Sequence, residues 1–265
     1  MDFRISDLFI SYGIEYSGSI PMDNALIINR RLYERTVSGF AKNVIVFLVP
    51  YLASETKNNN ISLYAAPQDY HIYMKGLFSM IEPALSELFP GRSFKGMSDS
   101  SPINETKAAA LCGLGIIGDN TRLINEKYGS FVFIGEIYTD AEIEADDPKP
   151  IEGCLHCGLC ASACPAEFGK TCLSEITQKK GVLSEDEKNL IKRAGSAWGC
   201  DVCQTVCPLN SEKCLTGIEF FKKDLIYNLN SRTLSEMTDE EFRRRAFSWR
   251  GKSVPERNLR ILEQE

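Results

Sequence analysis

Two largely apolar runs lie in the first half of the chain. Val44–Val49 form the first run, which Pro50 ends, and Phe131–Tyr138 form the second. Apolar runs of this length are typical of strands whose two faces are both covered. Between the runs, apolar residues at helical spacing predict helices over Tyr70–Phe89 and Glu105–Leu111. Strands separated by helices indicate an α/β layer in this part of the chain.

The cysteines change this picture after about residue 147. Cys112 is the one cysteine before that point, and the other nine lie between Cys154 and Cys214. The acidic, proline-bearing run Glu142–Pro150 is the expected linker, because its prolines disfavour helix and its charges resist burial. We interpret Cys112, which follows three alanines and a leucine, as a small buried hydrophobe. Cys214 has no assigned role.

Polar patterns add two expectations for the last third of the chain. Ser184 followed by Glu187 matches a capping box and predicts a helix from about Glu185 to Trp198. Basic residues outnumber acidic ones between Arg243 and Arg260. This basic tail could serve a polyanionic partner, but a solvated face of a terminal helix is the favoured interpretation.

Composition places the chain among ordinary globular proteins. Its 265 residues are 43% hydrophobic and 25% charged, and the net charge of -6 argues against broad, nonspecific affinity for nucleic acid. The N-terminus lacks the pattern of a signal peptide, and no stretch reaches the ~18 apolar residues of a membrane span. The sequence therefore predicts a cytoplasmic protein without membrane contact, in which clustered cysteines bind metal or act in catalysis.

The cysteines follow the spacing that bacterial ferredoxins use around a 4Fe-4S cluster. The first motif is C-x2-C-x2-C-x3-C-P and the second is C-x2-C-x3-C-P. In such pairs the last cysteine of one motif binds the cluster of the other. One predicted ligand set is Cys154, Cys157, Cys160 and Cys207. The other set is Cys164, Cys200 and Cys203, with Cys172 as the nearest candidate for the fourth ligand.

Two zinc sites are the alternative interpretation, since C-x2-C pairs also build tetrahedral zinc centres. The run of consecutive C-x2-C steps and the repeated Cys-Pro ending favour iron-sulfur clusters instead. Two clusters alone describe an electron carrier. The roughly 150 residues before them make an enzyme plausible, because a carrier does not need such a domain.

A G-x-G-x-x-G pattern occupies Gly113–Gly118. The nicotinamide fingerprint requires a strand before these glycines, whereas the preceding residues are predicted to be helical. A tight turn, or close approach of the backbone to a ligand, is the favoured interpretation.

Several segments together carry a family resemblance. They are Asp69-Tyr70-His71, Asp99-Ser100-Ser101-Pro102, Gly113 to Thr121, Tyr128 to Glu136, both cysteine motifs and Gly199-Cys200-Asp201. In order and spacing they resemble epoxyqueuosine reductase. That family performs the last reduction of queuosine synthesis on tRNA and uses cobalamin and two 4Fe-4S clusters.

The resemblance implies an α+β architecture in three parts. Residues 1–147 would form an α/β domain of nitroreductase or Rossmann-like type that binds cofactor and substrate. Residues 148–215 would form a ferredoxin-like two-cluster domain, and residues 216–265 a short helical tail. The chain would then be a short form without the helical repeat domain of the family.

The resemblance also implies site residues and partners. Asp99 matches the proposed proton donor to the substrate, and Asp69 matches a second active-site acid. Cys172 matches the remaining cluster ligand. Cobalamin would lie against the segment from Gly115 to Phe131 and the residues around Asp201. The implied cofactor contacts are Gly115, Asn120, Ser130 and Asp201. Expected partners are tRNA or a small-molecule substrate and a low-potential electron donor such as flavodoxin or ferredoxin.

Plain structural roles remain open for both acids. Asp99 could be an ordinary turn residue that bonds its own backbone, and Asp69 could cap the helix that starts at Tyr70. The chain also has Ile116 and Asp119 where the family usually has Trp and Lys. Two other functions therefore stay open: a cobalamin and 4Fe-4S reductase of another small molecule, similar to a reductive dehalogenase, and a noncatalytic ferredoxin-type carrier.

Overall fold

The computed structural model describes residues 2–22, 27–55, 58–145, 147 and 153–264. These form two compact units. The first comprises Met1–Tyr51, Tyr73–His156 and Glu212–Gly217, and the second Leu52–Ile72, Cys157–Ser211 and Ile218–Glu265. Each unit thus combines segments that are distant in sequence. Most of the predicted linker after residue 145 lies outside the described residues, and the domain limits at 147 and 215 stay a prediction.

A four-stranded sheet organises the first unit. Its strands are β1 (Ser17–Pro21), β2 (Asn43–Pro50), β3 (Phe94–Ser98) and β6 (Val132–Thr139), in the order β1-β2-β6-β3. All three ladders are antiparallel. The mixed α+β class is confirmed, but the antiparallel ladders do not form the parallel sheet of a Rossmann-like domain. Apolar runs reveal that a strand is buried on both faces, whereas strand direction depends on connections that the runs do not encode.

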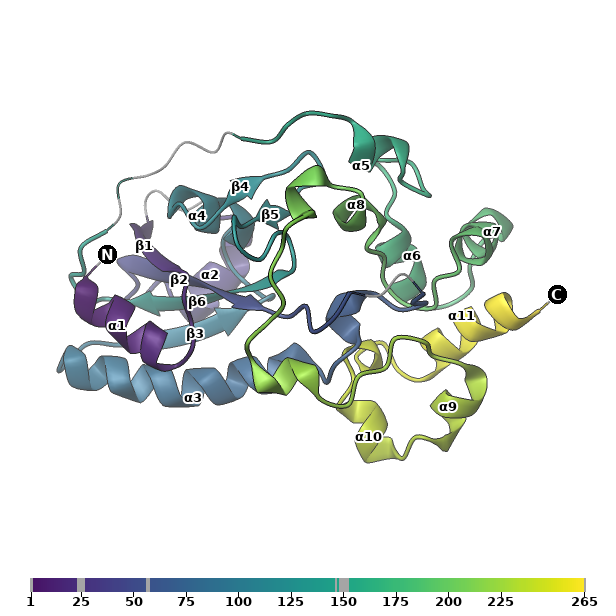
Figure 1. Ribbon diagram of the computed structural model, residues 1–265. Coiled ribbons are helices and arrows are strands. Elements are labelled where there is room, and N and C mark those ends of the chain that lie inside the picture. The colour runs from purple at the N-terminus through teal and green to yellow at the C-terminus, as the bar shows by residue number, and fades with distance from the viewer. Residues whose placement is uncertain (1, 23–26, 56–57, 146, 148–152, 265) are drawn as a thin grey trace. The chain divides into compact units, whose positions relative to one another are not determined.

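Helices cover both faces of this sheet (Figure 1). On one face, Phe47 of β2 contacts Phe9 of α1 (Phe3–Ser11) and Phe78 of α3 (Tyr70–Leu88). On the other face, α4 (Glu105–Leu111) packs three buried alanines against the alternate residues of β2. This two-sided cover explains why β2 is apolar at every position after Asn43.

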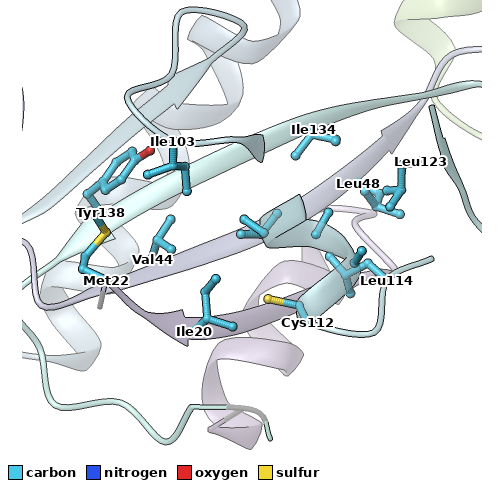
Figure 2. Packing of buried hydrophobic residues seen from close by; sticks show 14 of the residues in the cluster. Ile20, Met22, Val44, Leu48, Ile103, Cys112, Leu114, Leu123, Ile134 and Tyr138 are labelled. Atoms are coloured by element: carbon cyan, nitrogen blue, oxygen red, sulfur yellow. The ribbon is translucent and has the colours of Figure 1, made fainter. Parts of the chain in front are cut away.

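The core beneath α4 contains one of the unassigned cysteines. Figure 2 shows Cys112 among Ile20, Leu114 and other buried side chains of the cluster. Cys112 is 7% exposed, which confirms its interpretation as a small buried hydrophobe. Tyr138 reaches into the same cluster from β6.

The predicted helices and strands of the first unit are confirmed to within one or two residues. The helix predicted to end at Phe89 ends at Leu88, and α4 has the predicted bounds. The remaining elements are α2 (Arg30–Thr36) and a hairpin of β4 (Ile116–Ile117) and β5 (Leu123–Ile124). Two glycines of the sheet are required for packing, because a Cβ at Gly135 would lie 2.2 Å from the Phe47 ring and a Cβ at Gly96 would lie 2.2 Å from the Phe78 ring.

Short helices build the second unit. They are α5 (Leu159–Ser162), α6 (Leu173–Gln178), α7 (Glu185–Ala194), α8 (Val202–Thr205), α9 (Ser231–Glu236), α10 (Asp239–Arg243), α11 (Ser253–Glu263) and the 3-10 helices Leu63–Ala65, Pro208–Asn210, Glu219–Lys222 and Ala246–Ser248. One core surrounds Trp198 and Phe247, which are both fully buried. A second joins α6 and α7 through Leu173, Ile176 and Ile191.

The end of α7 corrects one expectation. The predicted capping box between Ser184 and Glu187 is present. The helix stops at Ala194, however, and does not continue to Trp198. Gly195 adopts the left-handed conformation at φ 63° and caps the C-terminus, and the following residues turn to bury Trp198.

Among the residues that the structure describes, every helix is too short or too polar to cross a lipid bilayer.

Candidate functional site

Asp99 occupies an unusual turn in the first unit. It follows directly on the end of β3, and its φ of 61° is positive although it is not glycine. The Ser100 N–H donates a hydrogen bond to the Ser98 carbonyl at 2.6 Å, so Asp99 is the central residue of a three-residue turn. Turns of this kind with positive φ are rare and strained. A strained acidic residue with an exposed side chain is a stronger pointer to function than an ordinary turn.

A carboxyl group that is fully buried lies in the same unit. Glu136 is 0% exposed, and alternation along β6 places it on the face covered by α4, as for Ile134 and Tyr138. Its Oε2 accepts hydrogen bonds from Ser101 Oγ and from the Tyr138 hydroxyl, both at 2.6 Å. Burial raises the pKa of Glu136 to about 8, and the nearby charge of Glu105 adds to the rise.

Glu105 links this buried group to the turn. It is the first residue of α4, after the cap Asn104, and it accepts a hydrogen bond from the Asp99 backbone N–H. Burial and the negative charge of Asp99 raise the pKa of Glu105 to about 7, although the hydrogen bond and the charge of Arg122 oppose the rise. Near neutral pH both glutamates can therefore hold protons.

The motifs of the sequence give these two glutamates no role. Glu136 carried a signal nevertheless, because a carboxylate in the middle of a strand that is otherwise buried needs partners or a proton. Glu105 carried none, since an acid in the first turn of a helix is ordinary stabilisation. Only the fold brings the two together beside Asp99.

The glycine segment forms a tight hairpin. Helix α4, not a strand, precedes Gly113, so the nicotinamide fingerprint lacks its required strand. A Cβ at Gly115 would lie 2.6 Å from the Ile124 carbonyl oxygen, and the hairpin closes through hydrogen bonds from Gly118 to Arg122 and from Thr121 to Gly118. This confirms the tight turn, whereas close approach of the backbone to a ligand stays a prediction.

The polar residues expected at cobalamin lie in buried positions. Asn120 is 8% exposed and its Oδ1 accepts the Arg122 N–H, and Ser130 is 5% exposed just before β6. Both belong to the first unit, as does Gly115. Their contact with a cofactor stays a prediction.

Asp69 lies in the second unit and caps the start of α3. Its Oδ1 accepts the backbone N–H of His71 at 3.0 Å, at the start of α3. The same oxygen pairs with His71 Nδ1 at 2.8 Å. The capping role is therefore present. Asp69 and Asp99 belong to different units, and a catalytic role for Asp69 stays a prediction.

Asp201 is anchored within the second unit. It is 7% exposed, and its carboxylate accepts hydrogen bonds from Ser62 Oγ at 2.6 Å, the Leu63 N–H at 2.7 Å and Gln204 Nε2 at 3.0 Å. The side chain thereby ties the residues after Cys200 to the chain around residue 62. A contact between this region and a cofactor stays a prediction.

The cysteines are free thiols, and several of them lie in or next to short helices. All ten lie in the described residues, and none forms a disulfide. In the second unit, Cys172 directly precedes α6, Cys203 lies in α8 and Cys207 precedes the 3-10 helix that Pro208 begins. Burial raises the pKa of Cys200 to about 11, with smaller contributions from Asp201, Cys203 and Cys172. A shared ligand set of Cys172, Cys200 and Cys203 stays a prediction.

Cys154 lies in the first unit and has two polar neighbours. The ligand atoms of Asp119, Cys154 and His156 all lie within 4.8 Å of one another, and His156 Nδ1 contacts Asp119 Oδ1 at 2.9 Å. The chain thus places an acid and a histidine beside the first cysteine of the motif.

Several basic side chains of the tail have partners within their own unit. Arg243, Arg244 and Arg260 each pair with an acidic residue one helical turn before. Arg245 and Arg257 donate to backbone carbonyls of neighbouring segments. These contacts support the interpretation of a solvated helical face over that of a polyanion-binding surface.

The fold and the cysteine-rich segment together define the class, an α+β protein with a set of thiols suited to iron-sulfur clusters. No protein-family model matches the chain. Curated relatives do: the epoxyqueuosine reductase of Cellulophaga algicola is 31% identical over 230 residues, which are 82% of this chain and 74% of that protein. The enzymes of Leadbetterella byssophila and Lactococcus garvieae are 36% and 30% identical over 69% and 78% of this chain. This chain belongs to the epoxyqueuosine reductase family.

The matched segment spans 62% of the Lactococcus garvieae enzyme and 63% of the Leadbetterella byssophila enzyme. Solved structures agree on the fold. Epoxyqueuosine reductase from Streptococcus thermophilus superposes with a TM-score of 0.82 at 24% identity, over 99% of this chain and 80% of that chain. A reductive dehalogenase described for B12-dependent dehalogenation reaches 0.54 at 16% identity, over 97% of this chain and 35% of that chain.

Proposed function

We propose that this chain is a cobalamin-dependent iron-sulfur reductase that converts epoxyqueuosine to queuosine in tRNA. The observation that carries the proposal is the pair of cysteine motifs, found in a chain that belongs to the epoxyqueuosine reductase family. A solved member of the fold holds an epoxyqueuosine-modified tRNA stem loop. A low-potential donor such as flavodoxin or ferredoxin would supply electrons.

The donor set fits two 4Fe-4S clusters. Iron-sulfur clusters bind to thiolates, and this chain offers eight thiols in the ferredoxin arrangement. The proposed sets are Cys154, Cys157, Cys160 and Cys207, and Cys164, Cys172, Cys200 and Cys203. Cys172 also contributes, as the smallest cause, to the raised pKa of the Cys200 thiol, which agrees with the second set. Bound iron would lower the pKa of Cys200 and keep it a thiolate, in spite of its burial.

Cobalamin would supply two-electron reduction at the substrate carbon. On the protein side, Gly115 would contact the cofactor through its backbone while it keeps the hairpin tight against the Ile124 carbonyl, and Asn120 and Ser130 would provide polar contacts. Asp201 would hold the segment that follows Cys200 in place through its three hydrogen bonds. Asp69 is the second proposed acid.

Asp99 would act as the proton donor. Opening an epoxide C–O bond reductively leaves a negative charge on oxygen, which a nearby acid neutralises. The turn after β3 holds Asp99 in a strained conformation with its side chain exposed, as expected for a group that must reach a bound substrate.

The test is preparation of the protein without oxygen in the presence of cobalamin, followed by assay on epoxyqueuosine-containing tRNA. We expect ~8 irons per chain, bound corrinoid and turnover with a low-potential donor. Asp99→Asn should lower turnover by ~100-fold or more, with iron and corrinoid unchanged. Asp224→Asn is the matched control, because Asp224 also has positive φ, at 52°, but lies in the second unit.

Each alternative function has its own outcome. A chain with ~8 irons that retains no corrinoid would be a ferredoxin-type carrier. A chain with corrinoid and no turnover of the tRNA would be a reductase of another small molecule. The fold shared with reductive dehalogenases favours testing halogenated aromatic compounds in that case.

A further inference from the structure

Two glutamates of the first unit have no part in the chemistry described so far. Glu136 and Glu105 lie beside the Asp99 turn, and their carboxyl groups are close enough to interact electrostatically. Buried carboxyl groups are unfavourable unless they are paired or protonated, so both need an explanation.

The hydrogen bonds of Glu136 are unevenly distributed. Two hydroxyl groups, from Ser101 and Tyr138, donate to Oε2. Oε1 is buried and has no hydrogen-bond partner among the residues that the structure describes. A bare, buried carboxylate oxygen costs the full desolvation penalty, whereas a proton on that oxygen removes the charge. The geometry therefore favours a protonated Glu136.

In Glu105 too, one carboxyl oxygen has a hydrogen-bond partner and the other has none within the described residues. Glu105 accepts the Asp99 N–H, while its Oε2 is buried and, within the described part of the chain, has no partner. The hydrogen bond from the Asp99 N–H is strongest when Glu105 is ionised, because charge-assisted hydrogen bonds are stronger than neutral ones. Protonated Glu136 makes that ionised state of Glu105 possible, since two adjacent buried charges would repel each other.

We propose that Glu105 is the positioning residue of Asp99 and that Glu136 behind it keeps a proton, so that the strained turn is held when Glu105 is ionised and loosened when Glu105 is protonated. This inference rests on the proposed function in one respect, the role of Asp99 as the acid. In this arrangement Glu105 and Glu136 form a carboxyl pair that carries one negative charge between them.

The charged and titratable neighbours of the pair are few. Asp99 and Arg122 face Glu105, and Glu105, Tyr138 and the hydroxyl of Ser101 face Glu136. The charge of Arg122 opposes that of Asp99 at Glu105. Glu105 therefore takes up a proton near pH 7, and turnover should decline on the acidic side of that value.

The experiment is infrared titration of protonated carboxyl groups in the holoenzyme, with turnover measured over the same pH range. The variants are Glu105→Gln and Glu136→Gln, and Glu87→Gln, an exposed position on α3, is the control. We expect two carboxyl signals that titrate near pH 7 and pH 8, each removed by one variant and neither by the control. Glu105→Gln should also abolish the acidic limb of the turnover profile.

The readouts separate this inference from the proposed function, because the infrared titration needs no turnover. Absence of protonated carboxyl signals above pH 6 in the intact protein would overturn the proposal, whether or not the variants fold. An acidic limb that survives Glu105→Gln would overturn the positioning role. Both signals in a protein that does not act on epoxyqueuosine would uphold the carboxyl pair and reject the proposed substrate.

Discussion

The two units of this chain hold their chemical groups in different ways. In the second unit, six of the seven cysteines belong to two short sequence motifs, and short helices position them. In the first unit, Asp99, Glu105 and Glu136 come from a turn, a helix and a strand, and only the sheet and α4 bring them together. Metal ligands can thus be recognised from spacing, whereas a carboxyl site depends on burial. Predictions that disturb one unit without the other test this difference.

The largest effect is expected from the fourth ligand of the second cluster. Cys172→Ala should lower bound iron from ~8 to ~4 per chain and abolish turnover, because a cluster held by three thiolates is lost or incomplete. Cys214→Ala is the matched control, since Cys214 is also exposed and has no assigned ligand role. Iron analysis and electron paramagnetic resonance of the reduced protein measure the result. Equal iron content in the two variants would remove Cys172 from the ligand set.

The next effect concerns the pH dependence of stability in the first unit. The pKa of Glu136 lies at about 8 when folded, against an ordinary value of 4.5. Between these values the folded protein keeps a proton that the unfolded chain has lost, so the free energy of unfolding should fall as pH rises from about 4.5 to 8. The full effect has an upper limit of about 5 kcal/mol.

Glu136→Gln should reduce this slope, because glutamine does not titrate, and the raised pKa of Glu105 should account for the slope that remains. Urea unfolding at a series of pH values measures it, and Glu87→Gln should retain the slope of the unmodified protein. If the two variants behave alike, Glu136 does not hold the proton assigned to it.

The sequence indicated most of the elements and little of the carboxyl site. Strands β2 and β6 and helices α3 and α4 follow from runs and periodicity, since local burial alone dictates those patterns. Antiparallel pairing did not follow, because it depends on how distant strands meet. The end of α7 was misjudged, since the helical pattern continues to Trp198 while Gly195 ends the helix. Glu105 was missed because its burial arises from tertiary packing.

A smaller effect should follow from the anchor of the second unit. Asp201→Asn replaces an acceptor by an amide that cannot satisfy the Ser62, Leu63 and Gln204 donors together. Its cost should be ~1–3 kcal/mol, and iron should be lost faster on dilution into chelator. Asp186 is exposed in the first turn of α7, so Asp186→Asn should change neither the free energy of unfolding nor the rate of iron loss by a comparable amount. Unchanged stability and iron release would show that the anchor does not support the cysteine segment.

The smallest effect isolates backbone conformation at the end of α7. Gly195 has φ 63°, and a Cβ there would meet nothing within 4 Å, so Gly195→Ala introduces strain without a clash. The expected loss is ~1 kcal/mol in the free energy of unfolding. Gly39→Ala is the control, because Gly39 has equal space and no positive φ, and it should be neutral or slightly stabilising. Equal stabilities of the two variants would mean that the left-handed cap does not end α7, and that burial of Trp198 alone interrupts the helix.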